Sequence, residues 1–118
     1  MAREEFPDIV MFVEELYGKL RLHIIDGSYL DVWFSRRISG RYAYHWERRH
    51  INGSIYRHDD RPHMQWREME TFPKHFHYGS DGNVQESYIS DDPAEAIRSF
   101  LSFVKKKIKK EKKDESNS

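Results

Sequence analysis

The chain has 118 residues, no cysteine, and 20 acidic side chains against 20 basic ones. This length suffices for one domain, and the hydrophobic share of 37% excludes a wholly disordered chain. Without cysteine there is no disulfide framework, no thiolate metal site and no cysteine nucleophile. No run approaches the ~18 apolar residues of a membrane helix, and Glu4, Glu5, Glu14 and Glu15 do not fit a secretory signal. We therefore expect a cytoplasmic protein with no membrane partner.

Charge is distributed unevenly along the chain although the formal net charge is zero. Residues 105–118 hold seven lysines and three acidic residues, which leaves 13 basic and 17 acidic side chains in residues 1–104. Eight of eleven arginines lie between Arg36 and Arg67, and six of seven histidines lie between His45 and His77. This central band rich in Arg, His and aromatic residues is where we expect an anionic partner to bind.

The first third of the chain predicts a helix followed by a β-hairpin. Residues 9–17 carry apolar side chains at the spacing of one helical face, with Pro7 before them and Gly18 after them. Alternation of apolar and polar residues then predicts strands over residues 20–24 and 30–34. Asp26-Gly27 between them is typical of a tight hairpin turn.

The remaining elements are predicted by turn residues and by alternation. After Gly40, residues 41–49 predict a strand with Tyr42, Tyr44 and Trp46 on one face. Asn52-Gly53 predicts a second hairpin. The later segments are expected to be a strand over 55–59, a loop over 60–72, strands over 74–78 and 84–89, and a helix that starts at Asp91-Asp92-Pro93 and buries Ile97, Phe100, Leu101, Val104 and Ile108.

This order predicts an α+β fold: an antiparallel meander of five to six strands with an N-terminal and a C-terminal helix packed on one face. Residues 1–104 would form the single domain, and residues 105–118 a lysine-rich helix end and frayed tail. The other face of the sheet would be open to solvent or a partner. Arg41, His45, Arg57 and Asp59 are expected to project from it.

Two segments of the central band carry side chains suited to acid–base chemistry. His75 and His77 share one side of a strand, where they can act as base and acid around a phosphate or as two metal ligands. Asp59 can orient a histidine, while Arg57 and Arg61 can bind a phosphate and His63 follows closely. The histidine pair also fits two surface histidines beside a buried Phe76, and the Asp59 segment also fits a salt-bridged strand end and turn.

Further candidates concern binding. Arg61, Arg41, His45 and Lys74 are the predicted phosphate- or nucleic-acid-binding residues, and the lysine-rich end would add non-specific affinity for phosphates. Phosphate-binding glycine loops, dinucleotide fingerprints and the serine-hydrolase elbow are absent from the sequence, so those enzyme classes are excluded.

Three segments together resemble a known family. These are Tyr42–Trp46, Tyr56–His63 and Thr71–Gly79, followed by an acidic turn and a helix that opens with Asp-Pro. The combination resembles the TumE-like toxins of toxin–antitoxin operons, whose members carry Arg-x-Asp…Pro-His and Phe-Pro-x-His-x-His elements. The resemblance covers residues 20–104; the N-terminal segment and the lysine-rich end depart from it. It implies a small cytoplasmic toxin neutralised by a helix-turn-helix antitoxin, and it leaves the reaction open.

The residues extend this implication to a hypothesis about RNA. We expect a metal-independent endoribonuclease with His75, His77, His63, Asp59 and Arg57 as catalytic residues and no cofactor. One alternative is a non-catalytic module that binds an antitoxin or nucleic acid through the open sheet face. Another is a transition-metal site formed by His75, His77 and a nearby His or Asp. A homodimer is also among the expected assemblies.

Overall fold

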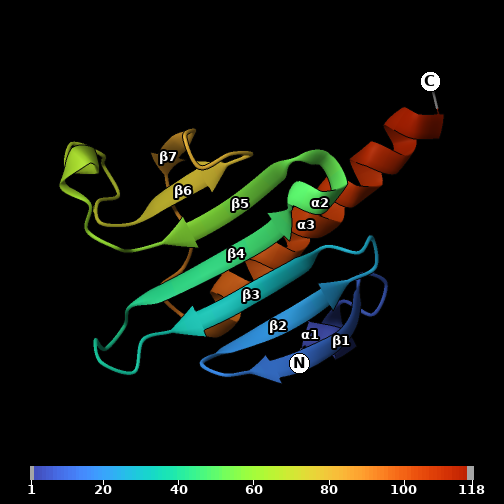
Figure 1. The fold of residues 1–118 in the computed structure, drawn as a ribbon, viewed down its shortest axis with the longest axis horizontal. Helices are drawn as coiled ribbons and strands as arrows, with labels where there is room; N and C mark the ends of the chain where they lie inside the picture. The colour runs from blue at the N-terminus through green and yellow to red at the C-terminus, as the bar shows by residue number, and fades with distance from the viewer. Residues whose placement is uncertain (1, 117–118) are drawn as a thin grey trace.

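A computed structural model describes residues 2–116 and shows one antiparallel sheet of seven strands in chain order, with the long helix α3 across one face (Figure 1). Each strand pairs with its neighbours in sequence, which confirms the predicted meander. The elements are α1 (Ala2–Glu5), β1 (Val10–Leu16), β2 (Lys19–Ile24), β3 (Tyr29–Phe34), β4 (Tyr42–Arg48), α2 (Arg49–Asn52), β5 (Ser54–Asp59), the 3-10 turn η1 (Met64–Trp66), β6 (His75–Tyr78), β7 (Val84–Glu86) and α3 (Pro93–Ser116).

The core lies between α3 and the aromatic face of the sheet. Asp92 caps α3, since its Oδ2 accepts the backbone N–H of Glu95 at 3.1 Å, and Pro93 takes the first helical position. The helix buries Ala96, Phe100, Leu101, Val104 and Ile108, whereas Ile97 is half-buried. They pack in one cluster with the predicted sheet-face residues Tyr42, Tyr44 and Trp46. The hydrophobic gain from this contact holds the helix on that face.

The predicted helix over residues 9–17 is wrong, because Val10–Leu16 form the edge strand β1. A two-residue turn at Tyr17-Gly18, with Gly18 at φ 83°, returns the chain so that Leu16 pairs with Lys19. Apolar residues such as Phe12 and Val13 fit the helical spacing but stay exposed on the strand. Among the described residues, the N-terminal helix is only Ala2–Glu5, and α3 is the long helix that lies across the sheet (Figure 1).

The C-terminal part of the sheet also differs from the prediction. Residues 84–89 were expected to form one strand, but β7 ends at Glu86. The backbone N–H of Ser87 then donates to Thr71 Oγ1 at 3.0 Å, so it leaves the β6 ladder, and Ile89 turns into the core. With β1 added, the sheet has seven strands rather than five to six.

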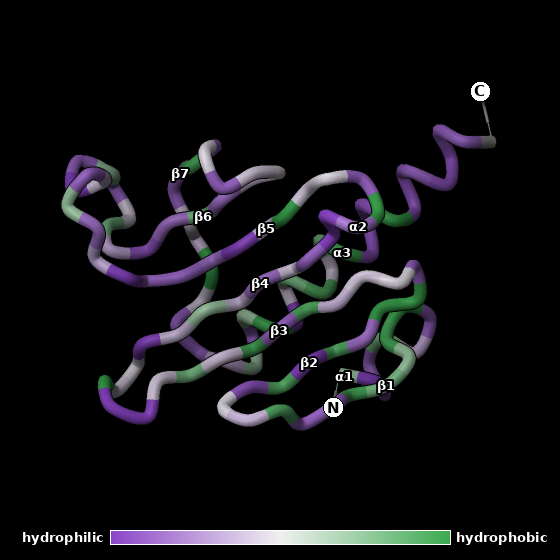
Figure 2. The backbone as a smooth tube through the Cα atoms, viewed as in Figure 1, coloured by the Kyte–Doolittle hydropathy of each residue, from purple (hydrophilic) through white to green (hydrophobic). Residues whose placement is uncertain are grey.

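The lysine-rich segment continues α3 and ends beyond the sheet, and apart from Ile108, which packs in the core, it is largely hydrophilic (Figure 2). Arg48 joins it to the sheet: Nη1 and Nη2 donate to the Glu111 carboxylate at 2.6 and 2.7 Å, and Nη2 donates to Asp26 at 2.9 Å. The Arg48 guanidinium also lies 4.5 Å from the Trp46 ring centre. Residues 117 and 118, where we expect fraying, lie outside the described residues.

Across residues 2–116, none of the helices combines the length and apolar character needed to cross a bilayer.

Among the polar groups on the helix-facing side of the sheet, the half-buried His58 has the most strongly shifted pKa. Its ring stacks on Phe76 with centroids 3.9 Å apart, and its Nδ1 lies 2.8 Å from Ser87 Oγ. Burial, with a smaller contribution from the charge of Lys74, lowers the pKa of His58 to about 3. The ring is therefore neutral in the folded protein near neutral pH.

We expect His58 to make the protein acid-sensitive. Its folded pKa lies below the unfolded value near 6.5, so the unfolded chain takes up the proton first as pH falls, and stability is lost from about pH 6.5 downward. This linkage should lower the free energy of unfolding by about 2 kcal/mol between pH 7 and pH 5. In urea titrations His58→Gln should remove that difference, whereas His50→Gln, at an exposed histidine, should not. An unchanged pH dependence in His58→Gln would contradict the assignment.

Candidate functional site

The site lies on the sheet face opposite α3 and is set by the register of β5 and β6. Asp59 is paired with His75, and Arg57 with His77. Directly paired residues point to the same face of an antiparallel sheet, so all four side chains lie together, as the sequence predicts for His75 and His77 on a strand. His63, in the loop between the two strands, comes near them, with its ring centre 6.0 Å from that of His75.

Asp59 is the anchor of this cluster. Its Oδ1 lies 2.9 Å from His75 Nε2 and accepts the backbone N–H of Arg61 at 3.0 Å, while its Oδ2 accepts Arg57 Nε at 2.9 Å. Burial alone would raise the pKa of Asp59, but the close contact with His75 and the hydrogen bond from Arg57 hold the pKa well below its usual range. The carboxylate is therefore charged although it is only 7% exposed.

His75 is the most deeply buried member, at 2% exposure. Its Nδ1 donates to the Pro73 carbonyl at 3.1 Å, which turns Nε2 toward Asp59. Burial by itself would lower the pKa of His75, but the Asp59 carboxylate and the Pro73 carbonyl together raise it. The 2.9 Å contact with Asp59 is nevertheless poorly aligned, so Nε2 has no well-directed hydrogen-bond acceptor.

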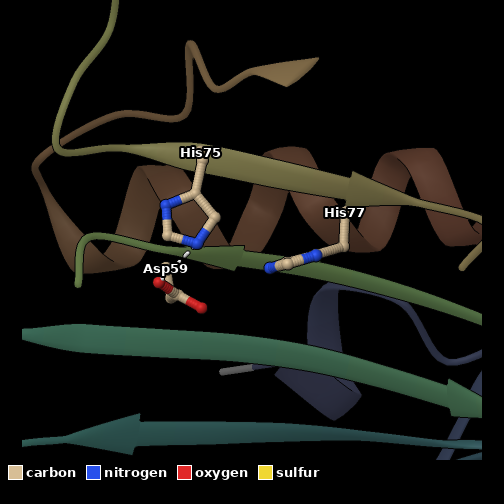
Figure 3. Close-up of side chains that lie close together, drawn as sticks. All are labelled: Asp59, His75 and His77. Atoms are coloured by element: carbon tan, nitrogen blue, oxygen red, sulfur yellow. Dashed lines mark ion pairs between the residues drawn. The ribbon is translucent and has the colours of Figure 1, made fainter. Parts of the chain in front are cut away.

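The His77 ring is also oriented by a hydrogen bond from Nδ1 to a backbone carbonyl. Its Nδ1 donates to the Asp81 carbonyl at 2.9 Å, which fixes the tautomer and leaves the Nε2 lone pair available. The rings of His75 and His77 have centroids 5.0 Å apart and are nearly perpendicular. Figure 3 shows both side chains extending from β6 across β5 toward the side that carries Asp59.

The loop between β5 and β6 covers the cluster. Trp66, in η1, lies with its ring 4.5 Å from the His75 ring and 5.7 Å from the His77 ring. His63 packs edge-on against Trp66 and stays exposed. Asp59, His75 and His77 are therefore buried beneath this loop, with His63 and the exposed Arg61 on its outer side.

The other predicted residues are less closely associated. His45 joins the network, since its Nδ1 lies 3.4 Å from Arg57 Nη1 and its Nε2 lies 3.0 Å from Glu47. Arg41 instead pairs with Asp60, whose Oδ1 also accepts the Tyr42 backbone N–H. The Lys74 ammonium bonds the Ile89 carbonyl and lies 3.3 Å from Asp91.

The sequence interpretation missed a cleft of about 370 Å³ on the same face. Its lining residues from β2 to β5 are Lys19, Arg21, Tyr29, Asp31, Trp33, Ala43, His45, Glu47 and Arg57. Arg21 lies over the Tyr29 ring at 3.8 Å and binds Asp31 through two hydrogen bonds. The alternation of β2 and β3 was the available signal, because it places Arg21, Asp31 and Trp33 on the face of His45. Arg57 links this cleft to the histidine cluster.

Comparison with known proteins identifies the family. The family described as Toxin TumE matches residues 3–108. The chain belongs to the TumE toxin family. The match confirms the resemblance predicted from the sequence, extends it over the N-terminal segment that was expected to depart from the family, and contains Asp59, His75 and His77. No curated protein and no solved structure matches the chain.

For this TumE-family protein, the burial of Asp59 makes a testable difference in stability. Asp59→Asn keeps the shape but leaves the charges of Arg57 and His75 without their partner, so we expect unfolding to become easier by roughly 3 kcal/mol. Glu14 supplies a matched control, because its Oε1 contacts His23 Nε2 at the same 2.9 Å on an exposed strand. Glu14→Gln should cost less than about 0.5 kcal/mol. Equal costs in urea titrations would show that Asp59 is no anchor.

Proposed function

We propose that this protein is the toxin of a toxin–antitoxin pair and cleaves RNA in the cytoplasm as a metal-independent endoribonuclease. The toxin component is supported by the family match. The observation that carries the chemistry is the convergence of two histidines, one carboxylate and one arginine: the ligand atoms of Asp59, His75 and His77 lie within 4.8 Å of one another, and Arg57 Nε donates to Asp59. These are the side chains that a phosphodiester transfer needs for proton transfer and charge stabilisation.

In this proposal His77 is the general base. Its Nδ1–H is held by the Asp81 carbonyl, so the neutral ring carries its lone pair on Nε2. That nitrogen would take the proton of a ribose 2′-hydroxyl as the 2′-oxygen attacks the adjacent phosphorus. The bond from phosphorus to the 5′-oxygen then breaks, which leaves a cyclic phosphate and a 5′-hydroxyl end.

The leaving 5′-oxygen needs a proton, and the cluster offers two donors. His75 is held by the Asp59 carboxylate in a manner that favours the protonated ring. His63 is exposed on the covering loop, with its ring 6.0 Å from that of His75. Because Trp66 lies over His75 and His77, the loop over residues 60–74 must move aside before a phosphate can reach either ring.

Two arginines would stabilise the negative charge on the phosphate. Arg57 is held by Asp59 through Nε, and its side chain is 35% exposed, so the rest of the guanidinium can bind a phosphate oxygen. Arg61 is exposed on the covering loop and can contribute a second cation. The cleft beside Arg57 offers Trp33, Tyr29 and Arg21 to a neighbouring nucleotide.

The proposal includes a protein partner. A toxin of this kind requires an antitoxin that neutralises it, and the sequence resemblance implies a helix-turn-helix protein. The expectation of a homodimer stays a prediction.

RNA cleavage in EDTA tests the proposed activity. Purified protein should cut single-stranded RNA without a metal, and His77→Gln should slow cutting by about 10²- to 10⁴-fold, because the base is lost. His23→Gln is the matched control: it removes another strand histidine that contacts a carboxylate, away from the cluster. Product ends should be cyclic phosphate and 5′-hydroxyl. Undiminished cutting by His77→Gln would contradict the assigned base, and no cutting by the wild type would contradict the activity.

A further inference from the structure

We propose that Asp59, His75 and His77 form a binding site for a divalent transition-metal ion of the zinc class. Each residue can direct one ligand atom to a common point, and these atoms all lie within 4.8 Å of one another. The three residues are buried together, which excludes a chance grouping of mobile surface side chains. This inference does not depend on the proposed ribonuclease activity.

The orientation of the two histidines is the first support. His75 donates Nδ1–H to the Pro73 carbonyl and His77 donates Nδ1–H to the Asp81 carbonyl. Metal-binding histidines characteristically give one ring N–H to a carbonyl or carboxylate, which orients the other nitrogen for the metal. Both rings of this pair are fixed in that way, from two different backbone segments.

The second support is an unpartnered buried atom. His75 is 2% exposed, and its Nε2 has no aligned hydrogen bond although Asp59 Oδ1 is 2.9 Å away. A buried polar nitrogen without a partner is costly. A cation between Nε2 and the carboxylate would satisfy both groups, whereas a proton can do so only along the poorly aligned contact.

Hydrogen bonds also fix the orientation of the Asp59 carboxylate. Asp59 is held by Arg57 Nε on Oδ2 and by the Arg61 backbone N–H on Oδ1. These bonds fix its orientation, as outer-shell partners of metal ligands do. Ligands bonded to zinc at ~2.0–2.1 Å in a tetrahedron lie about 3.4 Å apart. The ligand atoms that lie up to 4.8 Å apart therefore have to approach by up to about 1.4 Å, while the 2.9 Å gap between His75 Nε2 and Asp59 Oδ1 opens by about 0.5 Å.

The donor set indicates the class of metal. Two imidazole nitrogens and one carboxylate oxygen suit zinc and neighbouring transition metals, whereas magnesium and calcium prefer oxygen ligands alone. Three protein ligands also leave a fourth position open, as in catalytic rather than structural zinc sites.

Metal and substrate would compete for the same atoms. If the proposed ribonuclease activity is correct, a bound zinc ion takes the Nε2 lone pair of His77 and displaces the proton of His75. The metal-bound form would then be inactive, and the site would serve as an inhibitory switch.

Zinc binding can be measured directly on protein purified without a histidine tag. Competition with a chromophoric chelator should show one zinc per chain, and Asp59→Asn and His77→Gln should each weaken binding at least about 100-fold, because each removes a ligand. Cobalt should give visible absorption bands in the wild type that both variants lose. His23→Gln should bind as the wild type does. Circular dichroism and the melting temperature without metal would establish that the variants are folded.

The outcomes separate the two proposals. If the wild type binds no zinc beyond chelator competition, or if both folded variants bind as the wild type does, there is no site, whatever the nuclease assay shows. If zinc binds but RNA is not cut, the site stands and the ribonuclease proposal fails. If cutting occurs in EDTA and zinc suppresses it, the inhibitory switch is supported. If cutting requires zinc, the site stands and both metal independence and inhibition are contradicted.

Discussion

The antiparallel pairing of β5 with β6 is the constraint on which the rest of the account depends. Its register sets Asp59 opposite His75 and Arg57 opposite His77. A shift by one residue would send these side chains to the helix-facing side, where the core has no partners for their charge. The aromatic row that meets α3 on the other face fixes the register, because Tyr56 and Phe76 would otherwise be lost from the core. Core packing on one face of the sheet thus fixes the positions of the candidate site residues on the other face.

The sequence predicted much of this arrangement because the strands alternate between residues that pack against α3 and residues that face the other side of the sheet. The Asp26-Gly27 and Asn52-Gly53 turns lie where hairpins form, and Gly53 takes the left-handed conformation at φ 79°. The helix predicted over residues 9–17 was wrong for a physical reason. An edge strand exposed on most of its length does not need alternation, so its apolar residues also fitted a helical period. The family resemblance rested on the segments that became β4, β5 and β6.

The sequence predicted which residues come together on this face of the sheet, but it did not predict that a loop buries them. His75, His77, Asp59 and Arg57 do meet, because strand alternation and the pairing of β5 with β6 place them on one face, and the loop over residues 60–74 brings His63 near them. The covering role of Trp66 could not be read from a loop without periodicity, and neither could the side-chain contacts that draw Arg41 to Asp60 and Lys74 toward Ile89. A buried histidine pair beside a carboxylate is compatible with proton transfer and with a metal, and both depend on the same Nε2 atoms.

The central claim is that the cluster on the open sheet face causes toxicity. Growth after induced expression in bacteria tests it most directly, with protein abundance matched across variants. The wild type and His23→Gln should arrest growth, whereas His77→Gln and Arg57→Gln should not, because they alter the cluster without removing a helix-facing core residue. Growth arrest by both cluster variants at wild-type abundance would contradict the account.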